Sequence, residues 1–205
     1  MAVLCNAAQA RSVQLGRAVA TLYLPSQPHP GPEHAGAAVV AFDPAVAGLW
    51  ADTRTGEPFS LAVGMDGSLR SNGGEVVLAQ SPTLYEMGAE RLEFTSSDAF
   101  DRVSANGARR GYRRETPVTP TAEQLAAYAG VFTSDEAQAR LTVQVRDGVL
   151  TLVNRGYAMP MSAVYADVFT SEQGLIRFSR DEDGRVEALH VNNGRVRDMP
   201  LRREE

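Results

Sequence analysis

The sequence predicts a mainly β protein in which two small antiparallel eight-stranded barrels in tandem follow one strand and one helix. The stretch Val46–Trp50 has an echo at Tyr128–Phe132, and both share a central Ala-Gly, which indicates a duplication. After each copy come short runs of alternating apolar and polar residues, separated by turns that contain glycine. There are roughly eight such runs per copy and no room for crossover helices. A twisted sheet of that many strands tends to curl and close, because closure removes its unpaired edges.

The N-terminal residues 1–24 are expected to form the strand and the helix. Ala2–Cys5 is a short apolar run, and apolar residues recur at helical spacing from Val13 to Tyr23. One strand and one helix cannot bury both of their faces alone, so this piece needs a partner. Residues 25–40 contain four prolines and predict a stiff linker.

The first barrel is predicted over residues 41–117. Asp43 followed by Pro44 is an N-cap with proline at the first helical position, which predicts a single helical turn before Gly48. Asp-Gly, Gly-Gly and Asn-Gly pairs predict hairpin turns, because glycine and asparagine tolerate positive φ. The expected strands are 49–52, 59–63, 69, 75–79, 84–87, 92–95, 100–104 and 111–114.

The second barrel is predicted over residues 118–205. Thr121 and Gln124 form a capping-box pattern at the start of a helix that should run through Tyr128 and end at Gly130. Cleaner alternation follows, and Asp-Gly and Asn-Gly pairs again mark the turns. Near Ala188 three apolar residues cannot share one face unless the strand contains a bulge.

Composition excludes several chemistries. All 20 basic residues counted as Lys or Arg are arginine, so a Schiff-base lysine, a P-loop and a Ser-x-x-Lys nucleophile are all impossible. The net charge of −5 argues against a nucleic-acid surface. Cys5 is the single cysteine, so no intrachain disulfide can form. No signal peptide is recognised, which is typical of a cytoplasmic chain, whereas a longer parent protein could be periplasmic.

Three groups of polar residues are candidate sites. Arg109–Arg114 holds four arginines, which we interpret as a solvated strand and not as a polyanion site. Asp181–Asp183 adjoins a glycine turn and is interpreted as a solvated acidic loop. His190 lies on a strand with nothing nearby in the sequence to activate it, and His29 and His34 lie in the linker, which offers no fixed ligand geometry. We therefore predict no catalytic residue, no metal site and no cofactor.

The segments together resemble a known family. Ala2–Asn6 with the amphipathic segment to Leu24 resembles the last core strand and C-terminal helix of the penicillin-recognising serine hydrolases, the class C β-lactamase and D-aminopeptidase group. Tyr128–Glu136, the Asp147–Gly148 hairpin and Gly194–Arg197 are similar to the lipocalin-like barrel often appended to that catalytic domain. The D-aminopeptidases of the group carry two such barrels in tandem, and the resemblance covers nearly the whole chain.

The catalytic motifs of the family do not carry over. Its Ser-x-x-Lys is impossible without lysine, and no tyrosine here has Asn or Ser two places on. His29-Pro30-Gly31 matches the family's His-x-Gly in letters, but it follows the final helix instead of preceding it. The resemblance therefore implies a non-catalytic accessory region that shapes or gates a serine hydrolase domain.

Four residues are the candidates for a gating loop: Asn154, Arg155, Gly156 and Tyr157. In relatives a loop of the last barrel approaches the catalytic cleft, and a glycine beside an amphipathic tyrosine suits a protruding tip. A plain hairpin with an edge tyrosine is the alternative interpretation.

Two other functions stay open. The barrels could form a module for a small apolar ligand, although their own apolar residues are expected to fill such short repeats. Residues 2–24 could instead pair with a second copy of the chain, since an orphan apolar strand is a template for association. The expected partners are thus the serine hydrolase domain or a second copy, with neither nucleic acid nor membrane.

Overall fold

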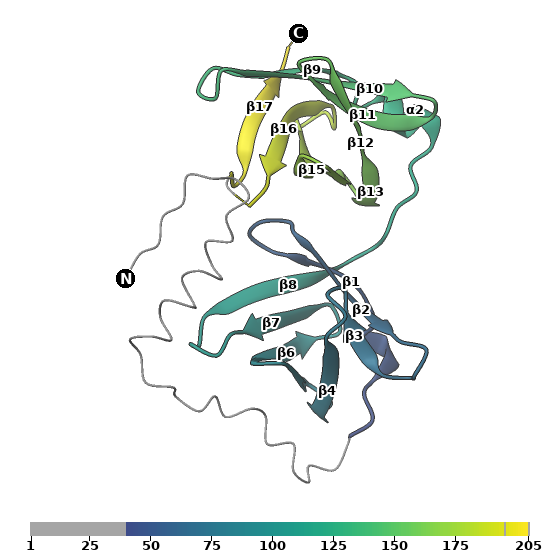
Figure 1. Cartoon of the computed structure of the whole chain (residues 1–205), viewed down its shortest axis with the longest axis vertical. Coiled ribbons are helices and arrows are strands. Elements are labelled where there is room, and N and C mark those ends of the chain that lie inside the picture. Colours follow the sequence, from purple (N-terminus) through teal and green to yellow (C-terminus); the bar gives the residue numbers. More distant parts are fainter. Residues whose placement is uncertain (1–39, 195, 205) are drawn as a thin grey trace, which may run out of the picture. The chain divides into compact units, whose positions relative to one another are not determined.

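The computed structural model describes residues 40–194 and 196–204 (Figure 1). The predicted strand and helix at 1–24, and the linker at 25–40 apart from Val40, lie outside the described residues. The described chain is mainly β, in two antiparallel barrel-like sheets in tandem, which confirms the predicted fold class. In this part of the chain no helix has the length and apolar character to cross a membrane.

Each sheet follows a short helical segment. Before the first sheet lies the 3-10 turn η1 (Pro44–Val46), and its strands are β1 (Gly48–Asp52), β2 (Pro58–Val63), β3 (Leu69–Ser71), β4 (Val76–Ser81), β5 (Leu84–Met87), β6 (Glu90–Ser96), β7 (Ala99–Val103) and β8 (Arg109–Glu115). Before the second lies helix α2 (Ala122–Ala126), and its strands are β9 (Gly130–Ser134), β10 (Ala139–Arg146), β11 (Val149–Asn154), β12 (Tyr157–Pro160), β13 (Ser162–Tyr165), β14 (Val168–Ser171), β15 (Gly174–Arg180), β16 (Val186–Asn192) and β17 (Met199–Arg203).

The two helical segments begin as the sequence predicts. Asp43 accepts a hydrogen bond from the Ala45 amide, and Thr121 and Gln124 exchange both bonds of a capping box. Helix α2 is shorter than predicted, because it ends at Ala126 and Tyr128 lies beyond it. The Tyr128 amide donates to the Leu125 carbonyl, three residues back, so the chain tightens into a turn before β9.

The first sheet is a closed barrel. Each strand pairs with the next in sequence, and β8 returns to pair with β1, where Arg114 stands opposite Trp50. Closure leaves no strand edge unpaired, as expected for a sheet of this size.

The second sheet has nine strands where the sequence predicts eight. Its end strands, β12 and β13, are neighbours in sequence and are separated only by Met161. The amide of Met161 still donates to the Leu150 carbonyl of β11, 2.8 Å away, and the chain then leaves β11 and pairs with β14. Pro160, which has no N–H to offer a ladder, immediately precedes the switch. One bent strand thus joins both ends of the sheet, so the repeat corresponds to eight strands.

The two sheets have β-bulges at equivalent positions, which indicates that they have the same strand arrangement. The pairing of β4 with β5 shifts between Ala79 and Ser81, and that of β13 with β14 shifts between Ala163 and Tyr165. Both shifts lie at the same step before the hairpin turn. The predicted bulge near Ala188 is also present.

In the pairing of β15 with β16, Ser179 stands opposite Ala188 and Arg180 opposite Val186, so Glu187 is the extra residue. This extra residue brings Val186 to the same buried side as Leu189, as the apolar pattern required.

Side chains fill the interior of each sheet. In the first, Trp50 and Phe100 meet edge to face with ring centroids 5.0 Å apart, and Phe100 stacks on Tyr112 at 4.9 Å. In the second, Phe132 and Leu189 are fully buried. The two clusters are separate and each is dense in aromatic and aliphatic side chains.

Candidate functional site at the helical end of the barrels

Each barrel has one end at which its helical segment lies, and we call it the helical end. At this end an arginine of the last strand contacts the backbone around the helical segment. Arg114 of β8 stands opposite Trp50, and Arg203 of β17 stands opposite Phe132, the equivalent residue of the echo. Arg114 donates to the carbonyls of Ala45 at 2.5 Å, Ala47 at 3.2 Å and Ser97 at 3.1 Å. Its guanidinium carbon also lies 4.1 Å from the centroid of the Trp50 ring.

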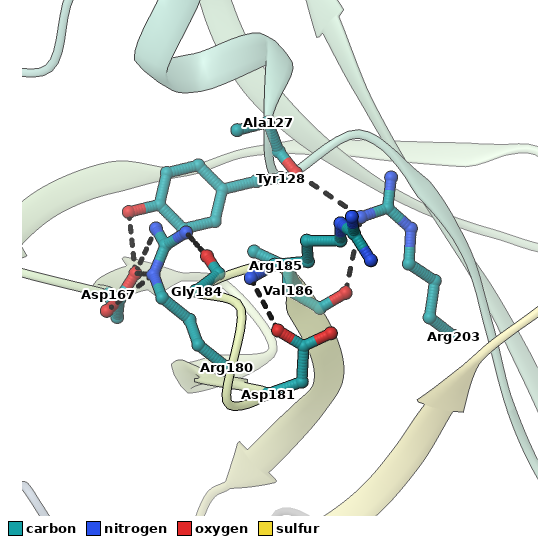
Figure 2. Close-up of polar contacts among 9 residues, drawn as sticks. All are labelled: Ala127, Tyr128, Asp167, Arg180, Asp181, Gly184, Arg185, Val186 and Arg203. Atoms are coloured by element: carbon teal, nitrogen blue, oxygen red, sulfur yellow. Dashed lines mark hydrogen bonds and ion pairs between the residues drawn. The ribbon is translucent and has the colours of Figure 1, made fainter.

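Arg203 makes the corresponding contacts in the second barrel (Figure 2). It donates to the carbonyls of Ala127 and Ala129, which lie between α2 and β9, and to that of Val186 in β16. Ala127 is the C-cap of α2, and its carbonyl is one that the short helix leaves without an intrahelical partner. Each arginine therefore ties the helical segment to the last strand of its barrel.

The arginine also accounts for the glycine of the echo. A Cβ at Gly48 would lie 2.6 Å from Nη1 of Arg114, and one at Gly130 would lie 2.9 Å from Nε of Arg203. Such distances are below ordinary contact, so the close approach of the guanidinium favours glycine at both positions. The sequence predicts that the glycine terminates the helix, but η1 ends at Val46 and α2 at Ala126, before the glycines, so the close approach of the arginine is the role that the structure shows.

Arg114 corrects the interpretation of the arginine cluster as a solvated strand. Its side chain is 29% exposed, whereas those of Arg109 and Arg113 are 54% and 63% exposed. The solvated interpretation holds for the latter two, while Arg114 lies on the inner side of β8. The signal in the sequence is an arginine at or next to the end of the last strand of both repeats, since β8 ends at Glu115 and β17 at Arg203.

A second set of polar contacts fills the helical end of the second barrel (Figure 2). The hydroxyl of Tyr128 donates to the Asp167 carboxylate at 2.8 Å, and the same carboxylate accepts from Arg180 at 2.6 Å and 2.9 Å. The Tyr128 ring packs against Phe169 and Phe178 with centroids 5.0 Å and 4.8 Å away. Burial, and then the hydrogen bond to Asp167, raise the pKa of Tyr128, which keeps its hydroxyl protonated as a donor.

The acidic run after β15 builds a turn next to this cluster. Asp181 accepts from the amides of Asp183 at 3.0 Å and Arg185 at 2.8 Å, and Arg180 donates to the Gly184 carbonyl at 2.8 Å. The predicted acidic loop is thus an ordered turn in which Asp181 satisfies backbone donors.

His190 has an acidic partner that sequence spacing did not reveal. Its Nδ1 atom lies 3.1 Å from Oδ1 of Asp198, and Arg177 donates to the same carboxylate oxygen at 2.5 Å. Burial, followed by the charge of Arg177, lowers the pKa of His190, against the opposing effect of Asp198. The imidazole is therefore neutral near pH 7.

The four predicted loop residues lie together in one hairpin between β11 and β12. Asn154 pairs with Tyr157, and Arg155 and Gly156 between them have φ of 49° and 84°. Positive φ at both central positions is typical of a two-residue type I′ turn, which protrudes little. Tyr157 is 62% exposed, and its hydroxyl donates to Glu172 at 3.0 Å. The gating role of this hairpin stays a prediction.

Known proteins provide one informative match. Residues 114–203 match the family described as "Domain of unknown function (DUF3471)", a domain often C-terminal to β-lactamase-like proteins. The match begins at Arg114 and ends at Arg203, so it contains all of the second barrel. No curated protein matches the chain.

Among solved structures the chain is similar to one entitled "Crystal structure of SurE", with a TM-score of 0.32 and 15% identity. The similarity covers 64% of this chain, which spans 37% of that one. A likeness this low supports no inference about fold or function.

Proposed function

We propose that this protein is a non-catalytic accessory β-barrel region that acts beside a penicillin-recognising serine hydrolase domain of the β-lactamase and D-aminopeptidase group, and shapes or gates access to its active site. The observation that carries the proposal is the match of residues 114–203 to a domain often C-terminal to β-lactamase-like proteins. The tandem arrangement of two barrels supports the D-aminopeptidase side of that group.

The absence of lysine supports an accessory role, because the nucleophile of this hydrolase group needs a Ser-x-x-Lys pair. The filled interiors support it as well. Trp50, Phe100 and Leu189 occupy the space in which a larger barrel would enclose a ligand. A barrel of this kind has its outer surface and its turns to offer to a partner.

The hairpin at Asn154–Tyr157 is our candidate for the gating contact. The tight turn fixes the backbone, and the hydrogen bond to Glu172 restrains the exposed Tyr157 ring. Little conformational entropy is therefore lost when the ring binds to another surface. Residues 2–24 are the proposed region of attachment to the hydrolase domain or to a second copy of the chain.

The proposal is tested by finding and binding the hydrolase. An open frame beside the coding sequence should encode Ser-x-x-Lys and Tyr-x-Asn or Tyr-x-Ser, and the protein it encodes should form a complex with this chain in isothermal titration calorimetry. Fluorophosphonate and fluorescent penicillin probes should label that hydrolase and leave this chain unlabelled. Labelling of this chain, or neighbouring frames that encode no such hydrolase, would contradict the proposal.

A further inference from the structure

Several residues at the helical ends of the two barrels correspond to one another. The Phe94 amide donates to the Thr83 carbonyl at 2.8 Å, and the Phe178 amide donates to the Asp167 carbonyl at 2.8 Å. In each barrel the acceptor lies two residues after the bulged end of a strand, which is Ser81 in β4 and Tyr165 in β13. Thr83 is therefore the counterpart of Asp167, and Phe94 is the counterpart of Phe178. The echo makes Val46 the counterpart of Tyr128.

The first barrel has a smaller side chain at each position that fills the second. Val46 stands where the second barrel has Tyr128, and Thr83 where it has Asp167. Ser96 follows Phe94 by two residues, as Arg180 follows Phe178, although the extra residue of the pairing lies on β6 in the first barrel and on β16 in the second. A pocket of about 320 Å³ lies at this place in the first barrel. Its lining consists of Asp43, Ala45, Val46, Pro82, Thr83, Phe94, Thr95, Ser96, Ser97 and Arg114.

The pocket is lined by the ring of Phe94, which other side chains bury only in part. Phe178 is buried, since the Tyr128 ring packs against it, whereas Phe94 is only partly buried. Phe94 still contacts Trp50 and Tyr85 from below, with ring centroids 5.5 Å and 5.2 Å away. The missing contact is therefore the one that a ring would make from the pocket side.

The charged groups of the pocket already have partners. Arg114 donates to three carbonyls, and Asp43 accepts from the Ala45 amide. Thr83 stands at the position from which Asp167 accepts the Tyr128 hydroxyl in the second barrel, and it offers a hydroxyl to the pocket in place of a carboxylate. These features favour a neutral ring that carries a hydroxyl over a charged ligand.

We propose that the helical end of the first barrel binds a phenolic ring in the position that Tyr128 occupies in the second barrel. A volume of about 320 Å³ is at the lower end of the range of ~300–1,000 Å³ for small-molecule pockets, so it suits a single ring. The ring is either a tyrosine side chain of a peptide or a free phenol. The site needs no hydrolase and is independent of the function proposed above.

The test is an NMR titration of the 15N-labelled full chain. The ligands are N-acetyl-tyrosinamide for the peptide source, p-cresol for the free phenol, and N-acetyl-leucinamide as an aliphatic control. We expect the amide signals of Thr83, Phe94 and Ser96 to shift with a millimolar Kd, as is usual for ligands of this size. Response to the tyrosine amide alone supports the peptide source, and response to both phenols supports recognition of the ring. No shift with either, or an equal response to the leucine amide, would overturn the proposal.

Variants localise the site. Val46→Tyr supplies the missing ring from within and should weaken binding at least about tenfold, as should Ser96→Arg, which fills the mouth without altering the core. Val63→Tyr is the matched control, because Val63 is 50% exposed on β2 and lines no part of this pocket. If the first two variants bind like the wild type, the pocket is not the site.

Discussion

Replacement of Tyr128 by valine, its counterpart in the first barrel, measures what the filled helical end contributes to stability. Tyr128 is 6% exposed and its ring contacts two buried phenylalanines. Removal of most of an aromatic core side chain costs about 2–4 kcal/mol when a smaller apolar group remains. Tyr128→Phe removes only the bond to Asp167, which keeps Arg180 as a partner, so we expect a loss of about 1 kcal/mol.

Tyr157 provides the matched control for this pair of variants. It also donates to a carboxylate, at 3.0 Å, but it is 62% exposed. Tyr157→Val and Tyr157→Phe should therefore leave the free energy of unfolding close to that of the wild type. Urea unfolding followed by far-UV circular dichroism measures all four. The reasoning is refuted if Tyr128→Phe costs as much as Tyr128→Val, or if the Tyr157 variants cost as much as those of Tyr128.

The remaining predictions concern the arginines and the histidine. Arg114→Met and Arg203→Met should each lose about 2–3 kcal/mol in urea unfolding, with only partial recovery by lysine, while the exposed control Arg109→Met should lose clearly less. Equal losses for all three would show that the buried contacts do not matter. Because the folded pKa of His190 is lowered, the unfolded chain takes up a proton first as pH falls below about 6.5, so stability should decrease from there toward the folded pKa. His190→Gln, which still faces Arg177, Glu187 and Asp198, should show a smaller loss between about pH 7.5 and about pH 5.5, and an unchanged loss would contradict this.

Local patterns allowed most of the fold to be predicted from the sequence. The Thr121–Gln124 capping box, the glycine turns and the bulge near Ala188 each depend on residues a few positions apart, and all appear in the structure. The duplication is visible because both helical ends need the same small and aromatic residues at the same spacing. The break at Met161 could not be predicted in this way. Only the pairing partners show that the chain pairs with β11 before Met161 and with β14 after it.

The site was less predictable because its contacts join distant parts of the chain. Arg114 sits among solvated arginines, and only the pairing of β8 with β1 places it on Trp50, 64 positions earlier in the sequence. His190 and Asp198 lie on opposite sides of a turn, so spacing alone does not show their contact. The pocket of the first barrel depends on three substitutions that matter only when the two repeats are compared in register.

The accessory role is tested most directly by the kinetics of the associated hydrolase with and without this chain, measured with substrates of increasing size. We predict that the chain changes KM several-fold, more for bulky substrates than for small ones. We also predict that replacement of Asn154–Tyr157 by Gly-Ser residues removes most of that difference. Identical kinetic constants for all substrates, with or without the chain, would contradict the proposed function.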